Sequence, residues 1–324
     1  MAKSKKDIKK IVSYVGTALM IVSMVFVAQR LRNTAGGEGG INFEVLTSHW
    51  IIAGLLLVAI TEGLGIFAAG LNFRALVRNV SGVTLKRILT IKVYTESNVY
   101  KYIPGGVMYV AGRNRLAVEV DELAHSKVVL ATIIEGICMV IGVVVVATVF
   151  AYSHVARLFE YLGIIPIIIF ALGLLLLIAI PIIYVLRHRI GGLIKNLTSS
   201  METISWLVVV KRLGFSILLM FLYSVTFLIT LVLMGQDIDI SLGFAIIGLY
   251  LLSWLAGFLT PGAPSGLGIR EAVMVMFLTG FVDDTILVAA MVMHRVLTVI
   301  GDILAFLTAW TISRISSKSS MPLA

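Results

Sequence analysis

The chain has 324 residues, of which 59% are hydrophobic and only 13% are charged, and its net charge at pH 7 is +9. A soluble globular protein of this length needs more charged side chains to cover its surface, so that class is excluded. The single cysteine, Cys138, lies in an apolar run, which excludes a disulfide framework and a thiolate metal site. Basic residues fall in loops between apolar runs, a pattern typical of membrane topology and not of nucleic-acid binding.

Apolar runs long enough to cross the bilayer, which requires about 20 helical residues, recur along the chain. The seven runs are Ile11–Ala28, Trp50–Leu71, Val128–Ala151, Leu162–Leu186, Leu213–Met234, Leu242–Thr260 and Ile286–Ile312. The first run follows a lysine cluster, as in a signal peptide, but no small-residue cleavage site follows it, so we expect a retained helix. The runs predict an all-α polytopic bundle that forms one membrane domain over residues 1–324.

Two further segments, Thr84–Leu116 and Pro264–Phe281, contain Pro, Gly and charged residues, so neither is typical of a lipid-facing span. Lys and Arg are concentrated after the second run and between the fourth and fifth, which predicts that these loops and both chain ends are cytoplasmic. This topology requires residues 84–116 and 242–281 each to enter and leave on one side. We therefore predict two broken or re-entrant hairpins in a protein of the cell membrane.

The two hairpins share a short pattern. Pro104-Gly105 is followed by Arg113, and Pro261-Gly262 is followed by Arg270 at the same interval of nine residues. Two halves, residues 50–151 and 213–312 connected by 162–212, would then form an inverted repeat with a binding site where the broken helices meet. A chance match in a glycine-rich sequence is the alternative interpretation.

Charged side chains inside the membrane cost about 2.5–3.5 kcal/mol on insertion scales, so they normally face a cavity or each other. Those in or beside apolar segments are Glu62, Glu135, Arg270, Glu271, His294, Arg295 and Asp302. Arg295 and Asp302 are seven residues apart and share one helix face, where they either line a cavity or form a structural ion pair. His294 is either a packed residue or a proton relay.

A helix that restarts after a Pro-Gly break directs its free N–H groups into the break, where they can hold an anion. Arg113 and Arg270 follow the two breaks and could donate forked hydrogen bonds to one phosphate, or they could instead extend to the membrane interface. Glu271 could neutralise the empty cavity, or take up a proton as the substrate leaves. These residues predict a site for a phosphate-bearing lipid.

The chain resembles the transmembrane region of the lysylphosphatidylglycerol synthase/flippase family at Tyr102-Ile103-Pro104-Gly105-Gly106 with Arg113, and at Pro264-Ser265-Gly266-Leu267-Gly268-Ile269-Arg270-Glu271-Ala272. Glu135 and Arg295 also match residues common in that family, whereas Ser265 stands where Gly is usual and Gly136 where Arg is frequent. The hairpin chemistry and the resemblance together predict a head-group site. Its residues are Tyr102, Pro104, Gly105, Arg113, Gly266, Gly268, Arg270, Glu271 and Arg295, with Glu62, Glu135, His294 and Asp302 as coupling or ion-pair candidates.

The leading hypothesis is a flippase or transporter that binds an anionic phospholipid or a polyisoprenoid-phosphate-linked lipid between the two hairpins. The alternative is a non-transporting module that presents lipid to a partner lipid-modifying enzyme or glycosyltransferase, or docks such an enzyme. An intramembrane enzyme that uses Glu135, His294 and Asp302 is a third hypothesis. No hydrolase or ATP-binding motif is visible, and the short tail after Ile312 leaves no room for an aminoacyl-transferase domain, so we expect no catalysis, cofactor or metal.

Overall fold

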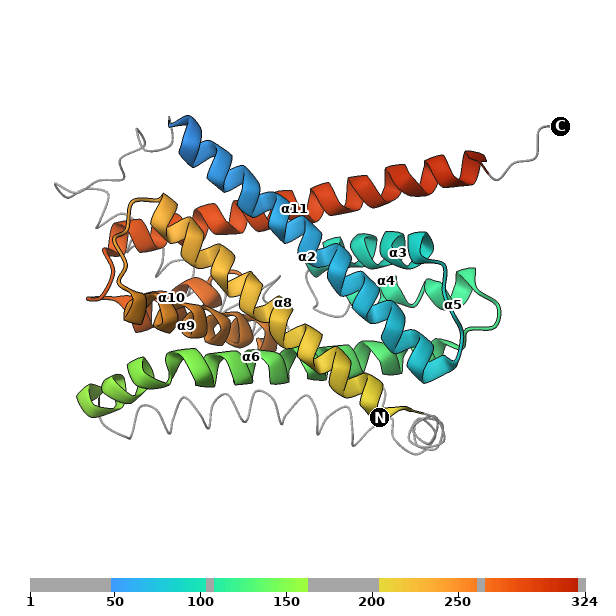
Figure 1. Cartoon of the computed structure of the whole chain (residues 1–324), viewed down its shortest axis with the longest axis horizontal. Helices are drawn as coiled ribbons and strands as arrows, with labels where there is room; N and C mark the ends of the chain where they lie inside the picture. The colour runs from blue at the N-terminus through green and yellow to red at the C-terminus, as the bar shows by residue number, and fades with distance from the viewer. Residues whose placement is uncertain (1–47, 103–107, 163–203, 261–265, 320–324) are drawn as a thin grey trace, which may run out of the picture.

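The computed structural model describes residues 48–102, 108–162, 204–260 and 266–319, which fold into helices joined by short connections (Figure 1). In chain order these are α2 (His49–Ser81), α3 (Arg87–Val99), η2 (Tyr100–Tyr102), α4 (Met108–Arg113), α5 (Leu116–Glu119), α6 (His125–Leu162), α8 (Trp206–Leu233), α9 (Ile240–Leu259), α10 (Ile269–Leu278) and α11 (Asp284–Ser319). The predicted all-α class is confirmed.

Five of the described helices are long and apolar enough to cross a membrane. They cover His49–Ser81, His125–Tyr152, Trp206–Leu233, Ile240–Leu259 and Asp284–Ser316. Each contains one of the predicted runs, or nearly all of it. The predicted run 11–28 and all but the first residue of the run 162–186 lie outside the described residues.

Helix α2 continues past the predicted run, which ends at Leu71, to Ser81. The added turns carry Arg74 and Arg78, but Phe73, Leu76, Val77 and Val80 keep one buried apolar face, so packing sustains the helix beyond the apolar run. Gly82 ends it with a φ of 77°, and its N–H donates to the Arg78 carbonyl at 2.8 Å. Hydropathy alone could not locate this end.

Glycines allow the long helices to cross closely. A Cβ placed on Gly301 of α11 would lie 2.7 Å from the Ala59 carbonyl oxygen of α2, and one on Gly63 would lie 3.0 Å from the Gly301 carbonyl oxygen. Helices α6 and α9 meet in the same way, since a Cβ on Gly248 would lie 2.6 Å from the Cβ of Ala151. Lipid gives helices little hydrophobic drive to associate, so such small residues allow the contact that holds them.

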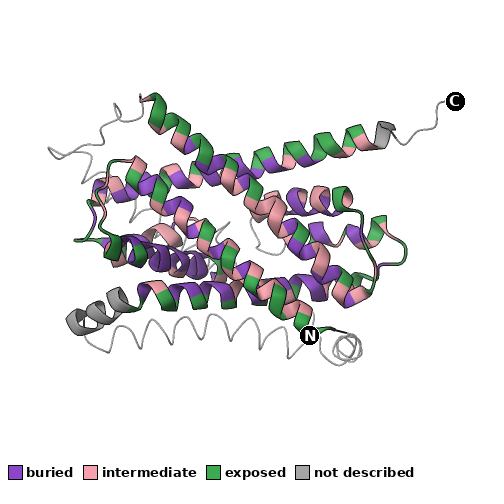
Figure 2. Cartoon of the chain, in the orientation of Figure 1, coloured by how far each residue is buried: buried purple, intermediate pink, exposed green. Residues whose placement is uncertain are grey.

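The predicted hairpins lie on opposite sides of α2 in Figure 1, with α3 to α5 on one side and α9 and α10 on the other. Helix α11 packs against both α3 and α10 and so connects the two groups. Figure 2 shows exposed residues along the outer faces of α2, α8 and α11, whereas α9 is largely buried. The most apolar window of α9 is 72% buried, against 28% for α2, so α9 lies inside the bundle.

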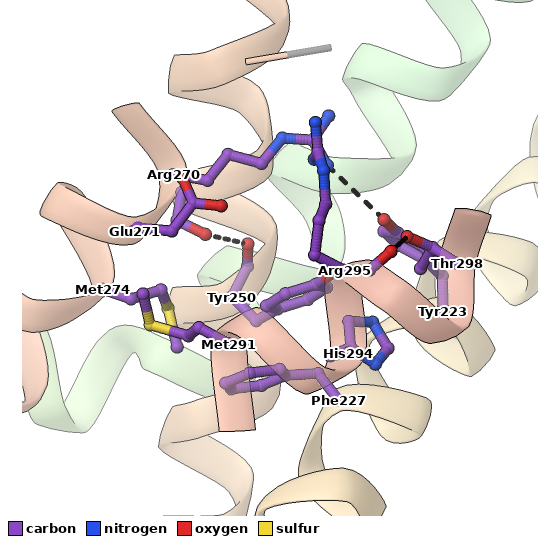
Figure 3. A pocket seen from close by; sticks show the side chains of 11 residues that line it. Tyr223, Phe227, Tyr250, Arg270, Glu271, Met274, Met291, His294, Arg295 and Thr298 are labelled. Atoms are coloured by element: carbon purple, nitrogen blue, oxygen red, sulfur yellow. Dashed lines mark hydrogen bonds between the residues drawn. The ribbon is translucent and has the colours of Figure 1, made fainter. Parts of the chain in front are cut away.

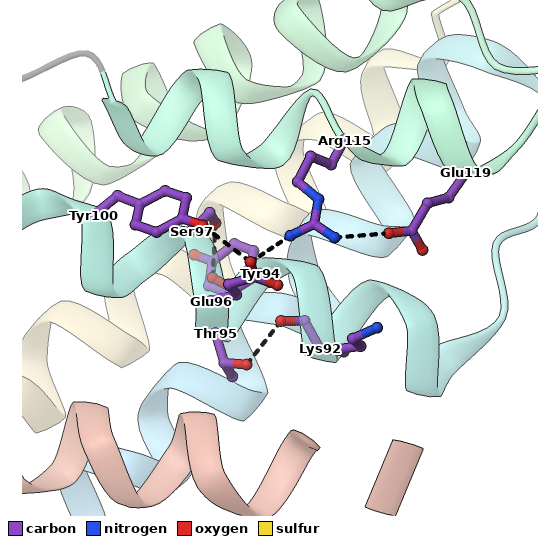
Figure 4. A network of polar contacts seen from close by, with 8 residues as sticks. All are labelled: Lys92, Tyr94, Thr95, Glu96, Ser97, Tyr100, Arg115 and Glu119. Carbon is purple, nitrogen blue, oxygen red and sulfur yellow. Dashed lines mark hydrogen bonds and ion pairs between the residues drawn. The ribbon is translucent and has the colours of Figure 1, made fainter. Parts of the chain in front are cut away.

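The first hairpin is held together by a polar network as well as by packing (Figure 4). Arg115 forms ion pairs with Glu96 of α3 and with Glu119 of α5, and the Tyr100 hydroxyl donates to Glu96 at 3.0 Å. A Cβ on Gly112 would lie 2.7 Å from the Tyr100 ring, so the two arms touch. The arms of the first hairpin therefore lie together, and α9 and α10 of the second also pack against each other. Residues 103–107 and 261–265, which hold the Pro-Gly breaks, lie outside the described residues.

Several predictions about how the chain is organised are not tested by the structure. Division of the chain into halves at 50–151 and 213–312, their relation as an inverted repeat, and the cytoplasmic location of the ends stay predictions. The two arginines that suggested the repeat, Arg113 in α4 and Arg270 in α10, do line one common cavity.

Candidate functional site

A central cavity of about 720 Å³ lies between the two hairpins. It brings together most of the predicted site residues, namely Glu62, Tyr102, Arg113, Glu135, Gly266, Arg270, Arg295 and Asp302. Glu271 and His294 line a smaller pocket beside it, and Gly268 precedes α10 with a φ of 80°. Pro104 and Gly105 lie outside the described residues.

Asp302 of α11 binds the first hairpin where α3 and η2 end. Its buried carboxylate accepts hydrogen bonds from Asn98 at 2.8 Å and from the Tyr102 hydroxyl at 2.5 Å, and forms an ion pair with Lys101 at 2.7 Å. Burial and the Asp302 carboxylate raise the pKa of the Tyr102 phenol, which lies outside the five spans, so Tyr102 remains a donor. Asp302 and Arg295 both line the cavity, and the carboxylate neutralises Lys101.

Arg113 and Glu135 form a buried ion pair that fixes α4 against α6. The Tyr94 hydroxyl donates to the second Glu135 oxygen at 2.9 Å, and the Arg113 guanidinium lies 4.3 Å from the centre of the Tyr94 ring. The two side chains are 6% and 3% exposed, so Arg113 does not extend to the interface. Its charge is compensated inside the protein, which reduces its capacity to bind a phosphate.

Arg270 lines the same cavity without such compensation. Its guanidinium lies 5.5 Å from the Trp254 ring centre, and its nearest hydroxyl contact is with Tyr223 at 3.5 Å. No described carboxylate forms an ion pair with it, and its Nε has no hydrogen-bond partner among the described residues. A half-buried guanidinium in this state has unused donors and an unpaired charge directed at the cavity.

Glycines place Arg270 across α9. Gly266 has a φ of 71°, and a Cβ on it would lie 2.7 Å from the Cα of Gly257. A Cβ on Gly257 would in turn lie 2.7 Å from the Arg270 Cγ. The Gly-Leu-Gly-Ile-Arg segment therefore allows the backbone to approach α9 closely enough for the arginine to lie over it and reach the cavity.

Residues 13–305 match the family described as lysylphosphatidylglycerol synthase TM region. The chain belongs to this family. No curated protein matches the chain. Membership together with the apolar helices makes the chain a multi-pass membrane protein of a family related to lipid handling, as the resemblance in the hairpins indicated.

The wall of the cavity is partly exposed on the outer surface of the helix bundle. Leu64 of α2, Leu222 of α8 and Phe258 of α9 line the cavity, yet their exposed fractions are 61%, 43% and 40%. Exposed apolar residues of a membrane bundle contact acyl chains. The cavity thus combines a polar interior with an apolar rim.

Sequence reasoning missed several residues of the site. Asn98, Tyr223, Thr226 and Trp254 all line the cavity, and Thr226 bonds Glu62 at 2.5 Å. In an apolar run these side chains look like ordinary packing or helix-surface residues, so the sequence carries no signal that separates them. In the part of the chain that the structure describes, no three His, Cys, Asp or Glu side chains are grouped as metal ligands.

Proposed function

We propose that this chain binds the anionic head group of a phospholipid or lipid-linked phosphate in the central cavity and moves that lipid between the leaflets. The observation that carries the proposal is Arg270, a cavity-lining guanidinium with no ion pair among the described residues. An uncompensated charge inside a membrane is costly, and a phosphate that accepts forked hydrogen bonds would offset that cost.

Charge and volume support the same ligand class. Four basic side chains (Lys101, Arg113, Arg270 and Arg295) and three acidic ones (Glu62, Glu135 and Asp302) line the cavity, which leaves an excess of one positive charge. The volume of about 720 Å³ falls within the range of about 300–1,000 Å³ typical of small-molecule sites. Such a space suits a head group, with the acyl or polyprenyl tails leaving past Leu64 and Leu222 into the bilayer.

The test is lipid movement in proteoliposomes that contain only this chain. Fluorescent phosphatidylglycerol and a zwitterionic phosphatidylcholine are followed by chemical quenching of the outer leaflet, with wild type beside Arg270→Gln. Faster movement of the anionic lipid, lost in the variant, supports the proposal. Arg78→Gln is the matched control, because Arg78 is an exposed arginine at the end of α2 that does not line the cavity.

Two other outcomes would redirect the proposal. Binding of the anionic lipid without movement would favour the alternative, a module that presents lipid to a partner lipid-modifying enzyme or glycosyltransferase. Chemical alteration of the lipid, detected by mass spectrometry of the same vesicles, would favour an enzyme, which we do not propose. Equal rates with and without protein, together with no binding, would refute both lipid movement and presentation.

A further inference from the structure

A second pocket of about 20 Å³ adjoins the central cavity and shares Arg270, Arg295 and Tyr223 with it (Figure 3). Its other polar walls are Tyr250 and Ser253 of α9, Glu271 of α10, and His294 and Thr298 of α11. A space of about 10–15 Å³ on this measure accommodates one water molecule, provided polar groups surround it. The pocket has the volume for one water and walls that can bind it.

The hydrogen bonds of Thr230 favour one tautomer of His294. The Thr230 hydroxyl has one hydrogen, which it donates to the Thr226 carbonyl at 2.8 Å. The same oxygen lies 3.2 Å from His294 Nδ1, so it accepts there, and Nδ1 carries the ring hydrogen when the imidazole is neutral. Nε2 then has a lone pair directed away from Thr230.

That lone pair has no partner in the described residues. His294 is 2% exposed, and its Nε2 is buried without a hydrogen bond. The Oε2 of Glu271 and the Nε of Arg270, on residues lining the same pocket, are also buried without one. Buried polar atoms are almost always satisfied, so three residues of one small pocket that each carry such an atom point to a bound polar molecule.

The groups that face His294 come from four helices. Tyr223 of α8 and Tyr250 of α9 have ring centres 6.0 and 5.4 Å from the imidazole, and Phe227 lies 5.5 Å away. A cation that lies over the face of an aromatic ring at this range is stabilised. Burial and the two arginines of the pocket oppose a further positive charge there, and Glu271 favours it. An anion bound at Arg270 would therefore shift the balance toward a protonated pocket.

We propose that one water molecule links His294 Nε2 to the Glu271 carboxylate and that this pair binds one proton from solvent when an anionic lipid head group occupies the central cavity. The proposal rests on the proposed function and adds its coupling to protons. No other bond changes, since the proton is held between Nε2, the water and the carboxylate, and its affinity belongs to the pair. The direction is uptake on lipid binding, opposite to the sequence expectation that Glu271 takes up a proton as substrate leaves. The bound anion attracts the proton, and its departure leaves Arg270 to repel it.

Linkage makes the effect measurable in both directions. If lipid binding increases the affinity for a proton, protons increase the affinity for lipid by the same factor. For one linked proton, the affinity for an anionic lipid rises by up to about tenfold for each unit that the pH falls.

The first experiment measures protons directly in the wild-type protein. Dioctanoyl phosphatidylglycerol is titrated calorimetrically into detergent-solubilised protein at pH 6, 7 and 8, each in two buffers with different ionisation enthalpies. A buffer-dependent heat that corresponds to proton uptake at one or more of these pH values supports the proposal. If lipid binds with the same heat in both buffers at every pH, after correction for dilution, the proton coupling is overturned and the proposed function stands. If no lipid binds, the proposed function and the coupling are both overturned.

Two variants test which side chains bind the proton. His294→Gln and Glu271→Gln remove one titratable group each and are expected to abolish proton uptake and to flatten the dependence of lipid affinity on pH. His125→Gln is the matched control, since His125 is an exposed histidine at the start of α6, and it should behave as wild type. Uptake that persists in both folded variants would exclude this pair. If size-exclusion chromatography shows that either variant is misfolded, calorimetry of the wild-type protein still tests whether lipid binding takes up a proton.

Discussion

At the scale of single residues, two arginines that look equivalent in the sequence have different environments. Arg113 and Arg270 each follow a Pro-Gly break by nine residues. Arg113 is compensated by Glu135, while Arg270 lies over Trp254 and forms no ion pair with a described carboxylate. A charge without a partner is the one that gains most from an anionic ligand, so the structure separates a structural arginine from a ligand-binding candidate.

Removal of the Glu135 charge should destabilise the protein strongly. Glu135→Gln leaves Arg113 buried without a counter-ion, and the free energy of unfolding should fall by about 3–5 kcal/mol. Thermal unfolding in detergent measures the loss. Glu119→Gln is the control, because Glu119 pairs with Arg115 at the surface and should cost under about 1 kcal/mol. Similar losses in both variants would contradict the buried pair as a stabilising contact.

At the scale of elements, buried polar side chains form hydrogen bonds between helices. Asp302 connects α11 to α3 and η2, and Thr226 connects α8 to Glu62 of α2. The glycine contact between α2 and α11 holds Glu62 and Asp302 close to the cavity that both line. A shift of α11 would therefore disturb packing and the site together.

The α2–α11 crossing should tolerate no added methyl group. Gly301→Ala places a Cβ 2.7 Å from the Ala59 carbonyl oxygen and 2.8 Å from the Glu62 Cβ, so the helices must separate. We expect a loss of about 1–3 kcal/mol in the free energy of unfolding, typical of overpacking. Gly214→Ala in α8 meets nothing within 4 Å and should be neutral or stabilising. A stable Gly301→Ala variant would refute the close crossing.

At the scale of the whole molecule, the cavity lies between the two predicted hairpin segments and is walled by the long helices. Arginines from both hairpins, an acidic residue from α2 and a charged pair of positions on α11 converge on one space of about 720 Å³. In the proposed function, its rim of exposed leucines would give lipid tails a route to the bilayer. This arrangement favours a ligand that is anionic at one end and apolar at the other.

Filling the cavity should stop lipid movement without a change of charge. Gly136 lines the cavity, and a Cβ on it would meet nothing within 4 Å, so Gly136→Phe can project into the open space. We expect a loss of most lipid movement in proteoliposomes, because a head group and the ring cannot share the space. Gly214→Phe, in the exposed position of α8 away from the cavity, should retain the wild-type rate. Wild-type movement in folded Gly136→Phe would show that lipid does not use this cavity.

Local chemistry was enough to predict the membrane class, the five spans that fall in the described residues and the two interrupted segments. Apolar run length, Pro-Gly pairs and loop charge are properties of neighbouring residues, which is why they can be read without a structure. The same reasoning identified Arg270, Glu271, His294 and Asp302 as charged or polar groups in apolar surroundings. Such groups are costly in a membrane and normally face a cavity or a partner.

Tertiary structure alone decided which groups are partners. Arg113 pairs with Glu135 across 22 residues, and Asp302 is bound by Asn98 and Tyr102 from about 200 residues away. Neither the continuation of α2 past its apolar run nor the apolar rim at Leu64 and Leu222 follows from composition. Contacts of this kind depend on where helices cross and which faces they present. The sequence alone determined a membrane bundle with charges inside it, and packing decided which of them pair, since Arg113 meets Glu135 while Arg270 has no ion pair among the described residues.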